Sequence, residues 1–377
     1  EMFRGVENKI AYLHDVKILN QDMVPYEIKK SSYNIEESLE NWIRNRKIPK
    51  NREFVNEILA SSGIAKEDNF MAYINISFGL SLNDCYWVVS NEQDYKWSDY
   101  NLYSNSFNET LALVAFTGIS TRLKELSVSP ELTTNGMLKK CWHKNESSGK
   151  IELYKGSNTK STEGGYEAYC EYYMAQIAKA LNLNAIDYDL VAFKKEIVSS
   201  CELFTSEKYG YLPIYYCLDK SDIKSDKLSL MKKIEEIYGK EAFEDLMLFD
   251  ALILNTDRHL GNFGMLIDNE SQKLVKAAPI FDNGLSFLNF IVQEKLKNIN
   301  NLMEDKISWF ELNFDDQAKM FDMPRHIGRL EKLSNFKFER HEFYNLDEKI
   351  LQAAENFISK RSQVILNMAI VTLNKLS

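Results

Sequence analysis

The sequence predicts an α+β protein with two lobes, a β-rich lobe followed by an entirely helical one, after an additional N-terminal α/β region. Short apolar runs separated by turn signals dominate residues 126–225, whereas helical periodicity is almost uninterrupted from Leu228 onward. Because strands and helices are segregated along the chain and do not alternate, the layout is α+β. We expect an accessory region at 1–125, the β-rich lobe at 126–225 and the helical lobe at 226–377.

The accessory region mixes helices and short strands. Residues 34–64, NIEESLENWIRNRKIPKNREFVNEILASSGI, carry apolar side chains at helical spacing and are interrupted at Pro49. Residues 74–90, INISFGLSLNDCYWVVS, are rich in strand-forming residues. Neither segment has side chains at catalytic spacing.

The β-rich lobe is predicted to contain a three-stranded meander and one helix. The strands are expected at 127–134, 137–144 and 150–155, separated by the turn signals TTNG and NESSGK. The helix begins after Gly164-Gly165 and runs through YEAYCEYYMAQIAKALN. Its spacing predicts a buried face made of Tyr166, Cys170, Tyr173, Met174, Ile177 and Leu181.

The last lobe is predicted to be helical almost to its end. Residues 350–376 form a long amphipathic pattern, and residues 241–255, EAFEDLMLFDALILN, repeat apolar side chains every three or four positions. Asp250 lies within the second pattern, where it could support the following loop or pair with an arginine such as Arg258. The apolar positions of that helix are Phe243, Leu246, Phe249 and Ile253.

Composition favours a soluble cytoplasmic protein. The 377 residues are 45% hydrophobic, and the five cysteines show no metal-ligand spacing, so we expect reduced thiols. No apolar run approaches the ~20 residues needed to span a bilayer, and no leader pattern opens the sequence, so no membrane association is expected. The net charge of −9 speaks against direct binding of nucleic acid through a broad surface.

Two short polar motifs follow apolar runs in the last lobe. Asp257 and Asn262 are five residues apart in NTDRHLGNFG, and Asp282 follows a short strand-like run in APIFDNGLSF. Phosphoryl transfer from ATP needs a carboxylate near the attacking hydroxyl and oxygen ligands for Mg²⁺, and this spacing matches a kinase catalytic loop followed by a metal-binding Asp. Either motif alone is more typical of a helix cap or a turn.

The β-rich lobe offers the other half of such a site. Lys155 ends the apolar strand KIELYK, where an ammonium group could hold ATP phosphates, although a strand-end lysine is often only a surface charge. Glu167 and Glu171 lie four residues apart on the next helix, and either could pair with the lysine or face solvent.

In this order, the motifs resemble the HipA-like serine/threonine kinases, a bacterial family with HipA-type toxins and CtkA-type kinases. The resemblance covers residues from about 127 to 290 and rests most specifically on NTDRHLGN and FDNG. It also extends over SPELTTNGMLKKCW, IELYKGS, EYYMAQIAKALNL and CELFTSE. It implies a two-lobed fold like that of protein kinases, with ATP and Mg²⁺ as cofactors.

The resemblance also assigns roles to individual residues. Lys155 would bind the ATP phosphates, Glu171 is favoured over Glu167 as its ion-pair partner, and Asp257 would orient the substrate hydroxyl. His259, which follows the catalytic Asp as in phosphatidylinositol kinases, could stabilise transferred charge or be a hydrogen-bonded structural histidine. Glu202 and Phe204 would meet adenine through their backbones, and Asn262 and Asp282 would hold Mg²⁺.

By the resemblance, the segment ELTTNGMLKK would be a loop that covers ATP phosphates, with Thr134 and Gly136 near the nucleotide. Its single glycine, Gly136, could instead belong to a simple Asn-Gly hairpin turn. The resemblance implies autophosphorylation at Thr133 or Thr134, which would repel ATP phosphates or pull the loop out of the site.

Three functions are consistent with the sequence. The preferred one is an ATP- and Mg²⁺-dependent serine/threonine kinase acting on a protein hydroxyl, either a toxin of a toxin–antitoxin pair or controlled by another regulatory protein. The second is a lipid or small-molecule kinase, because the Asp-Arg-His order is shared with phosphatidylinositol kinases. The third is a non-catalytic nucleotide-binding regulatory module, against which the retention of Lys155, Glu171, Asp257 and Asp282 argues.

Overall fold

The computed structural model describes residues 3–7, 10–31, 33–63, 70–119, 128–145, 147–158, 165–290, 306–321 and 324–376. Residue 127 and Gly164, which bound a predicted strand and a predicted helix, lie outside this part. The chain forms two compact units, each assembled from separate segments. The first consists of Glu1–Lys155, Leu203–Leu212 and Met265–Lys276, and the second of Gly156–Glu202, Pro213–Gly264 and Ala277–Ser377.

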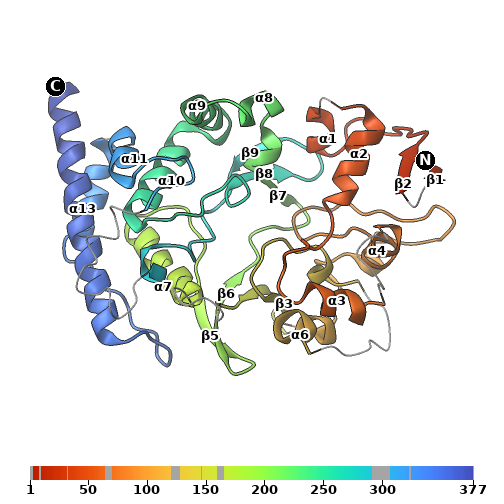
Figure 1. Ribbon diagram of the computed structural model, residues 1–377, viewed down its shortest axis with the longest axis horizontal. Coiled ribbons are helices and arrows are strands. Elements are labelled where there is room, and N and C mark those ends of the chain that lie inside the picture. The colour runs from red at the N-terminus through yellow and green to blue at the C-terminus, as the bar shows by residue number, and fades with distance from the viewer. Residues whose placement is uncertain are drawn as a thin grey trace. The chain divides into compact units, whose positions relative to one another are not determined.

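The first unit begins with small helices, as the sequence predicts. α2 (Ile35–Arg44) and α3 (Val55–Ser61) fall on either side of Pro49, and the Asn34 side chain caps α2 by accepting from the Glu37 N–H at 2.8 Å. α3 packs against α6 (Glu109–Thr117), and α6 against strand β3 (Lys140–Lys144), as Figure 1 shows. The remaining elements here are β1 (Phe3–Glu7), β2 (Ile10–His14), α1 (Tyr26–Lys30), α4 (Phe70–Ser77) and α5 (Trp97–Tyr100).

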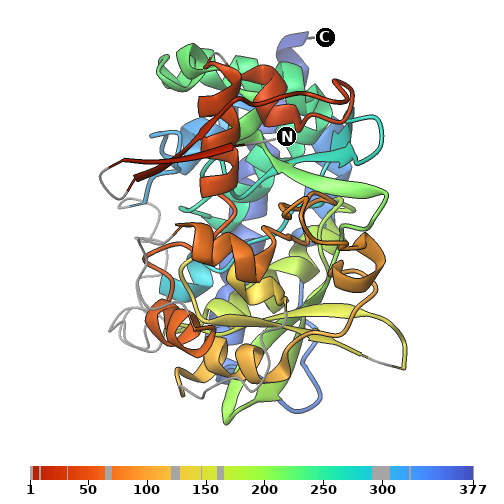
Figure 2. The same cartoon turned by 90° about the vertical axis from the view of Figure 1, so that its right-hand side faces the viewer.

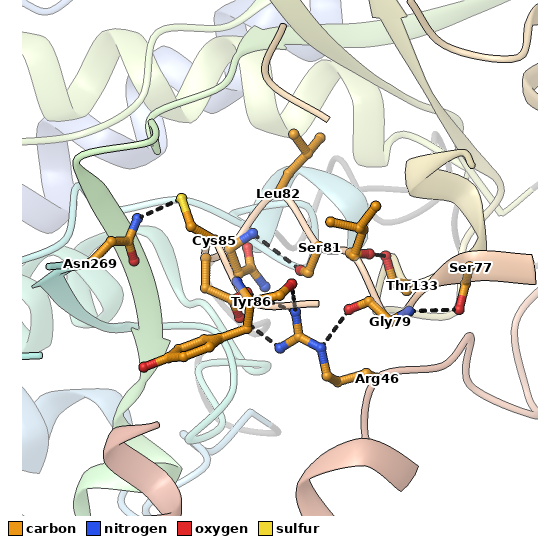
Figure 3. Close-up of polar contacts among 12 residues, drawn as sticks. Arg46, Ser77, Gly79, Ser81, Leu82, Cys85, Tyr86, Thr133 and Asn269 are labelled. Carbon is orange, nitrogen blue, oxygen red and sulfur yellow. Dashed lines mark hydrogen bonds and ion pairs between the residues drawn. The ribbon is translucent and has the colours of Figure 1, made fainter. Parts of the chain in front are cut away.

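The strand-rich prediction for residues 74–90 is wrong. α4 extends to Ser77, and residues 78–90 form turns and irregular structure. Their backbone groups are satisfied largely by side chains: the Arg46 guanidinium donates to the Gly79 and Tyr86 carbonyls, and Thr133 donates to the Leu80 carbonyl. Figure 3 shows these contacts.

Two of the three predicted meander strands are present in the first unit. β3 (Lys140–Lys144) and β4 (Ile151–Lys155) pair antiparallel, with Lys140 opposite Lys155, and appear as a yellow hairpin in Figure 2. The strand expected at 127–134 is wrong, because Pro130–Leu132 form a 3-10 helix with proline at its start.

A three-stranded sheet also lies almost entirely in the first unit. Its order is β7 (Tyr209–Pro213), β8 (Gly264–Asp268) and β9 (Leu274–Ala277). The expectation that residues 226–377 are entirely helical is therefore wrong at β8 and β9. Four-residue and five-residue strands are too short to interrupt the surrounding helical periodicity visibly.

The second unit contains the predicted long helices. α7 (Glu167–Ala180) buries the expected face apart from the half-buried Tyr166, and the four predicted apolar side chains of α10 (Lys240–Ile253) are fully buried. α10 packs against α9, α11 and α13. The other main elements are β5 (Asp189–Phe193) antiparallel to β6 (Glu196–Glu202), α8 (Lys220–Ile223), α9 (Lys227–Tyr238), α11 (Phe314–Met320), α12 (Ile327–Leu330) and α13 (Glu348–Leu376). None of the described helices is both long and apolar enough to cross a membrane.

Candidate active site

The first site motif begins where α10 ends. Leu254 adopts a left-handed conformation with φ of 52°, and the Asn255 N–H donates to the Asp250 carbonyl at 3.1 Å, which closes the helix. The Asn255 side-chain oxygen then accepts from the Asp257 N–H at 3.0 Å. The end of a fully packed helix thus fixes the backbone on which the half-buried Asp257 is carried.

Asn262 is brought back to Asp257 by the loop between them. Its Nδ2 donates to the Asp257 carbonyl at 2.9 Å, so the Oδ1 oxygen of the same amide is available as an acceptor. An oxygen in this position is a suitable ligand for Mg²⁺. The two residues therefore adjoin in the structure.

Arg258 joins this loop to the segment that carries Asp282. The guanidinium is 2% exposed and donates to the Asp250 carboxylate at 3.0 Å, to the Asn262 carbonyl at 3.0 Å and to Asn283 Oδ1 at 2.7 Å. It also donates to the Phe281 carbonyl. Burial alone would lower the pKa of Arg258, but the adjoining Asp250 carboxylate outweighs it and raises this pKa. Asp250 therefore both pairs with Arg258 and supports the loop.

Asp282 occupies an unusual backbone conformation, with φ of 58°. Its N–H donates to the Tyr188 hydroxyl at 3.4 Å, and its carbonyl accepts from Asn255 Nδ2 at 3.4 Å. Burial, followed by the charge of Glu171, raises the pKa of Tyr188 well above its usual value, so the phenol stays protonated. The backbone that carries the half-buried Asp282 side chain is thus held from two sides.

Glu171 on α7 contacts the same segment directly. Its carboxylate is fully buried and accepts from the Asn283 N–H at 2.7 Å. Glu167 is also buried and accepts from the Asn158 N–H at 3.2 Å, so neither glutamate faces solvent. Gly284 permits this approach, because a Cβ there would lie 3.3 Å from the Glu167 Cβ.

His259 has a structural contact of the kind considered for it. Its Nδ1 accepts from the Gly261 N–H at 3.0 Å, which fixes the ring against the loop backbone. With Nδ1 as an acceptor, a neutral ring carries its proton on Nε2. This hydrogen bond supports the structural reading of His259, and its role in charge stabilisation stays a prediction.

The remaining predicted residues are distributed over the two units. Lys155 is half-buried at the end of β4 and belongs to the first unit, as does Phe204, whose ring meets Tyr211 edge to face at 5.5 Å. Glu202 is exposed at the end of β6 in the second unit. The ion pair between Lys155 and Glu171 and the contacts of Glu202 and Phe204 with adenine stay predictions.

The phosphate-loop candidates are also in the first unit. Thr133 is buried, and its hydroxyl donates to the Leu80 carbonyl at 2.6 Å. The Thr134 hydroxyl donates to the Pro130 carbonyl at 2.6 Å and accepts from Trp142 Nε1 at 2.8 Å. Gly136 has φ of 95°, which favours glycine.

The oxygen donors suit a Mg²⁺ ion shared with a nucleotide. Within the described segments, no three His, Cys, Asp or Glu side chains are grouped so that they could hold a metal by themselves. Kinase Mg²⁺ is typically bound by one or two protein oxygens together with substrate phosphates. Asn262 and Asp282 match that donor set.

Sequence reasoning missed three residues of this network: Tyr188, Asn255 and Asn283. Asn255 and Asn283 lie within the quoted motifs NTDRHLGNFG and APIFDNGLSF, close to Asp257 and Asp282, so their position was the available signal. Tyr188 lies 94 residues before its partner Asp282, and nothing in its local sequence marks it.

Part of the chain is similar in sequence to known proteins. The HipA-like kinase family matches residues 141–326. The serine/threonine-protein kinase CtkA of Helicobacter pylori is 28% identical over 150 residues, which cover 36% of this chain and 46% of CtkA. The chain thus matches about half the length of this curated relative.

One solved structure shows a similar fold. The crystal structure of the Helicobacter pylori proinflammatory kinase CtkA matches with a TM-score of 0.50 and 20% identity, over 65% of this chain and 94% of that one. HipA of Shewanella oneidensis MR-1, solved with HipB and operator DNA, gives a TM-score of 0.47 and 14% identity over 98% of this chain and 94% of that one. Residues 141–326, slightly less than half of the chain, are thus similar to the HipA-like kinases.

Proposed function

We propose that the chain is an ATP- and Mg²⁺-dependent serine/threonine protein kinase. The observation that carries this proposal is the Arg258 network, which joins the Asp257–Asn262 loop to the Asp282 segment. A kinase requires these oxygens to be fixed before the nucleotide arrives, because catalysis of phosphoryl transfer is almost entirely positioning and electrostatic stabilisation. The named relative CtkA is a serine/threonine-protein kinase, which favours a protein hydroxyl as acceptor.

Each side chain has a definite task in this proposal. Asp257 accepts or orients the proton of the attacking hydroxyl, and Asn262 and Asp282 hold the Mg²⁺ that neutralises phosphate charge. Lys155 holds the ATP phosphates. Glu171 fixes that lysine while its carboxylate also accepts from the Asn283 N–H, so that one glutamate connects the phosphate-binding and metal-binding groups.

The test is incubation with γ-labelled ATP, Mg²⁺ and a cell lysate. We expect labelled protein with the parent chain and a loss of about hundredfold or more with Asp257→Asn, as expected for lost catalytic electrostatics. Asp94→Asn, which alters an exposed aspartate, is the matched control. Labelled lipid with unlabelled protein would indicate a lipid kinase, and nucleotide binding without any transfer would indicate a regulatory module.

Regulation by the Thr133–Thr134 segment is part of the proposal. A phosphate on Thr133 cannot remain at a buried hydroxyl bonded to the Leu80 carbonyl, so modification would require the segment to leave its present place. Mass spectrometry after incubation with Mg-ATP tests this, and unmodified Thr133 and Thr134 in an active enzyme would disprove it.

The proposed cellular role rests on the similarity to the HipA-like kinases. We propose a cytoplasmic enzyme, consistent with five cysteines that form no disulfide, that is paired with an antitoxin or another regulatory protein. Growth arrest on expression of the parent, absent with Asp257→Asn, is the expected toxin phenotype. Undisturbed growth with an active parent enzyme would contradict the toxin role and leave the kinase assignment intact.

A further inference from the structure

The N-terminal region contacts the candidate phosphate loop, defined here as residues 133–140. Both belong to the first unit. The contacts come from the turn just before α3, where Arg52 and Glu53 lie. This turn belongs to none of the site motifs described above.

Arg52 binds both ends of the 133–140 loop. Its Nη2 donates to the Lys140 carbonyl at 2.7 Å, and its Nη1 donates to the Thr134 carbonyl at a longer 3.5 Å. The side chain is 2% exposed. Burial lowers the pKa of Arg52 to about 10, with Glu131 opposing the change, so the group remains a cation at neutral pH. A buried cation directed at two carbonyls fixes their separation.

The middle of the loop is held by the same turn. The Glu53 N–H donates to the Met137 carbonyl at 2.9 Å. Together with the contacts of Arg52, this bond means that residues at the start, middle and end of the loop are tied to two consecutive residues of the N-terminal region.

A second part of the N-terminal region holds the loop from Thr133. The Thr133 hydroxyl donates to the Leu80 carbonyl, and the adjacent Gly79 carbonyl accepts from Arg46 Nε (Figure 3). Arg46 is itself paired with Asp84 at 2.7 Å. The loop is therefore attached to two buried arginine centres that lie in sequence well before it.

The apex of the loop is packed closely on Lys140. Its Nζ donates to the Asn135 carbonyl at 2.8 Å, and a Cβ at Gly136 would lie 2.2 Å from this Nζ. Loop backbone that presents N–H groups to phosphates must keep one shape, since preorganisation reduces the cost of binding. The contacts of Arg52 and Glu53 supply such a constraint from behind the loop.

We propose that the N-terminal region is a working part of the nucleotide site, in which Arg52 positions the 133–140 loop to receive ATP phosphates. Arg52 is a positioning residue, because it contacts the loop carbonyls and acts through them. This inference rests on the proposed kinase function. It gives residues 1–125 an intramolecular role.

The test compares Arg52→Lys and Arg52→Gln with the parent. Lysine keeps the charge but cannot span two carbonyls, and glutamine removes the charge. We expect the KM for ATP to rise about tenfold with much less change in kcat, the size expected when a charge-assisted hydrogen bond that shapes a site is lost. Arg44→Ala, which removes an arginine paired with Glu40 on the surface of α2, should match the parent.

Hydrogen–deuterium exchange provides a readout that does not depend on activity. Without nucleotide, residues 133–140 should exchange faster in both Arg52 variants than in the parent or Arg44→Ala, while α10 stays protected. Folded Arg52 variants with parental loop exchange and a parental KM would overturn the inference. If the parent neither binds nor turns over ATP, the proposed function fails by itself, and the exchange comparison still shows whether Arg52 holds the loop.

The parent alone gives a further test that needs no variant. Because coupling between sites is reciprocal, Mg-ATP should slow exchange in residues 50–58 as well as in the 133–140 loop. Slowing in the loop without any slowing at residues 50–58 would contradict the inference. This arm decides the matter even where substitution of Arg52 prevents folding.

Discussion

At the scale of single residues, Arg258 joins more parts of the candidate site by hydrogen bonds than any other side chain described above. It is buried and donates to a carboxylate, two carbonyls and a side-chain amide, which come from α10 and from both site motifs. Functional groups need to be held within about 0.5 Å of the productive geometry. The Arg258 guanidinium, with all of its N–H groups hydrogen-bonded, supplies that rigidity without phosphorylation of the chain.

Removing this guanidinium should destabilise the chain strongly. Arg258→Met leaves the Asp250 carboxylate buried and unpaired, so we expect the free energy of unfolding to fall by about 3–5 kcal/mol. Urea denaturation measures this, with Arg44→Met expected to stay within about 0.5 kcal/mol of the parent. The double variant Asp250→Leu with Arg258→Met should recover part of the loss, and a double variant no more stable than Arg258→Met would contradict the pairing argument.

Substitutions of Asp257 and Asp282 should differ in their effect on the affinity for Mg-ATP. Asp282→Asn removes a proposed Mg²⁺ ligand, so we expect the affinity for Mg-ATP to fall about tenfold or more, with little change for ATP measured in EDTA. Asp257→Asn should abolish transfer but leave both affinities near those of the parent. Calorimetric titrations measure these affinities, and equal losses for both variants would refute the division of roles.

Glu27 predicts a pH dependence of stability in the first unit. Burial raises the pKa of Glu27 from 4.5 to about 7, with Asp84 adding to the rise and Arg46 opposing it. The folded chain therefore binds this proton more tightly than the unfolded chain, so this stabilisation is complete below pH 4.5 and is lost as pH rises through 7.

For this half-buried carboxyl we expect the loss to be about 2 kcal/mol, once screening by water is allowed for. Thermal unfolding between pH 4.5 and 8 measures it. Glu27→Gln should remove this dependence, and Glu37→Gln, at an exposed position, should keep it. The same slope in parent and Glu27→Gln would exclude Glu27 as the source.

Sequence spacing singled out the candidate site residues but not the side chains that support them. Asp257, Asn262 and Asp282 follow apolar runs at recognisable intervals, so local order is enough to propose roles for them. Tyr188 and Arg52 contact residues 94 and 88 positions away, respectively. Such contacts depend on the tertiary fold, and no local period marks them.

Elements were predictable in proportion to their length and regularity. α7, α10 and α13 repeat their apolar side chains over several turns, and each is present. The strand expected within 74–90 is absent because the Arg46 and Thr133 side chains take the backbone carbonyls that a neighbouring strand would otherwise bind. A pattern of residue types cannot reveal whether a side chain or a neighbouring strand donates hydrogen bonds to these carbonyls.

The approach of α7 to the Asp282 segment should be sensitive to one methyl group. An alanine Cβ at Gly284 would lie 3.3 Å from the Glu167 Cβ and 3.6 Å from Glu171 Oε1. We expect Gly284→Ala to lower the free energy of unfolding by about 1–3 kcal/mol through overpacking. It should also lower kcat, because α7, which carries Glu167 and Glu171, would have to shift by a few tenths of an ångström.

Gly328 offers a matched control for this substitution. Nothing lies within 4 Å of a Cβ built at this exposed position in α12, so Gly328→Ala should be neutral or stabilise by about 0.4–1 kcal/mol. Chemical denaturation and initial-rate kinetics measure both variants. Equal stability and kcat for Gly284→Ala and the parent would rule out close packing at this point.

At the scale of the whole molecule, the compact units are not continuous stretches of the sequence. The three successive regions expected from composition remain a prediction, whereas the compact units are each made of three separate segments. The first unit combines the N-terminal 155 residues with two short later segments. A sequence read from one end to the other shows where patterns change, but not which distant segments pack together.

The N-terminal region should be indispensable for folding of the first unit. One buried apolar cluster contains Leu132 together with eight residues from 48–115, among them Ile58, Leu111 and Val114. A chain reduced to residues 126–377 would expose Leu132 and lose that core, so we expect no cooperative unfolding of the remaining first-unit segments. Limited proteolysis should cleave β3 and β4 rapidly, and a protease-resistant hairpin in the shortened chain would show that this prediction fails.

The hydrogen bond from the Asn283 amide to Glu171 bears on how such an enzyme is turned off. Swinging α7 outward would leave a fully buried carboxylate and a backbone amide without each other, a penalty of several kcal/mol. An inactive state reached by that movement would therefore be high in free energy, and the arrangement with this contact intact is the favoured one. Inhibition of the enzyme would then need a bound inhibitor or a covalent modification.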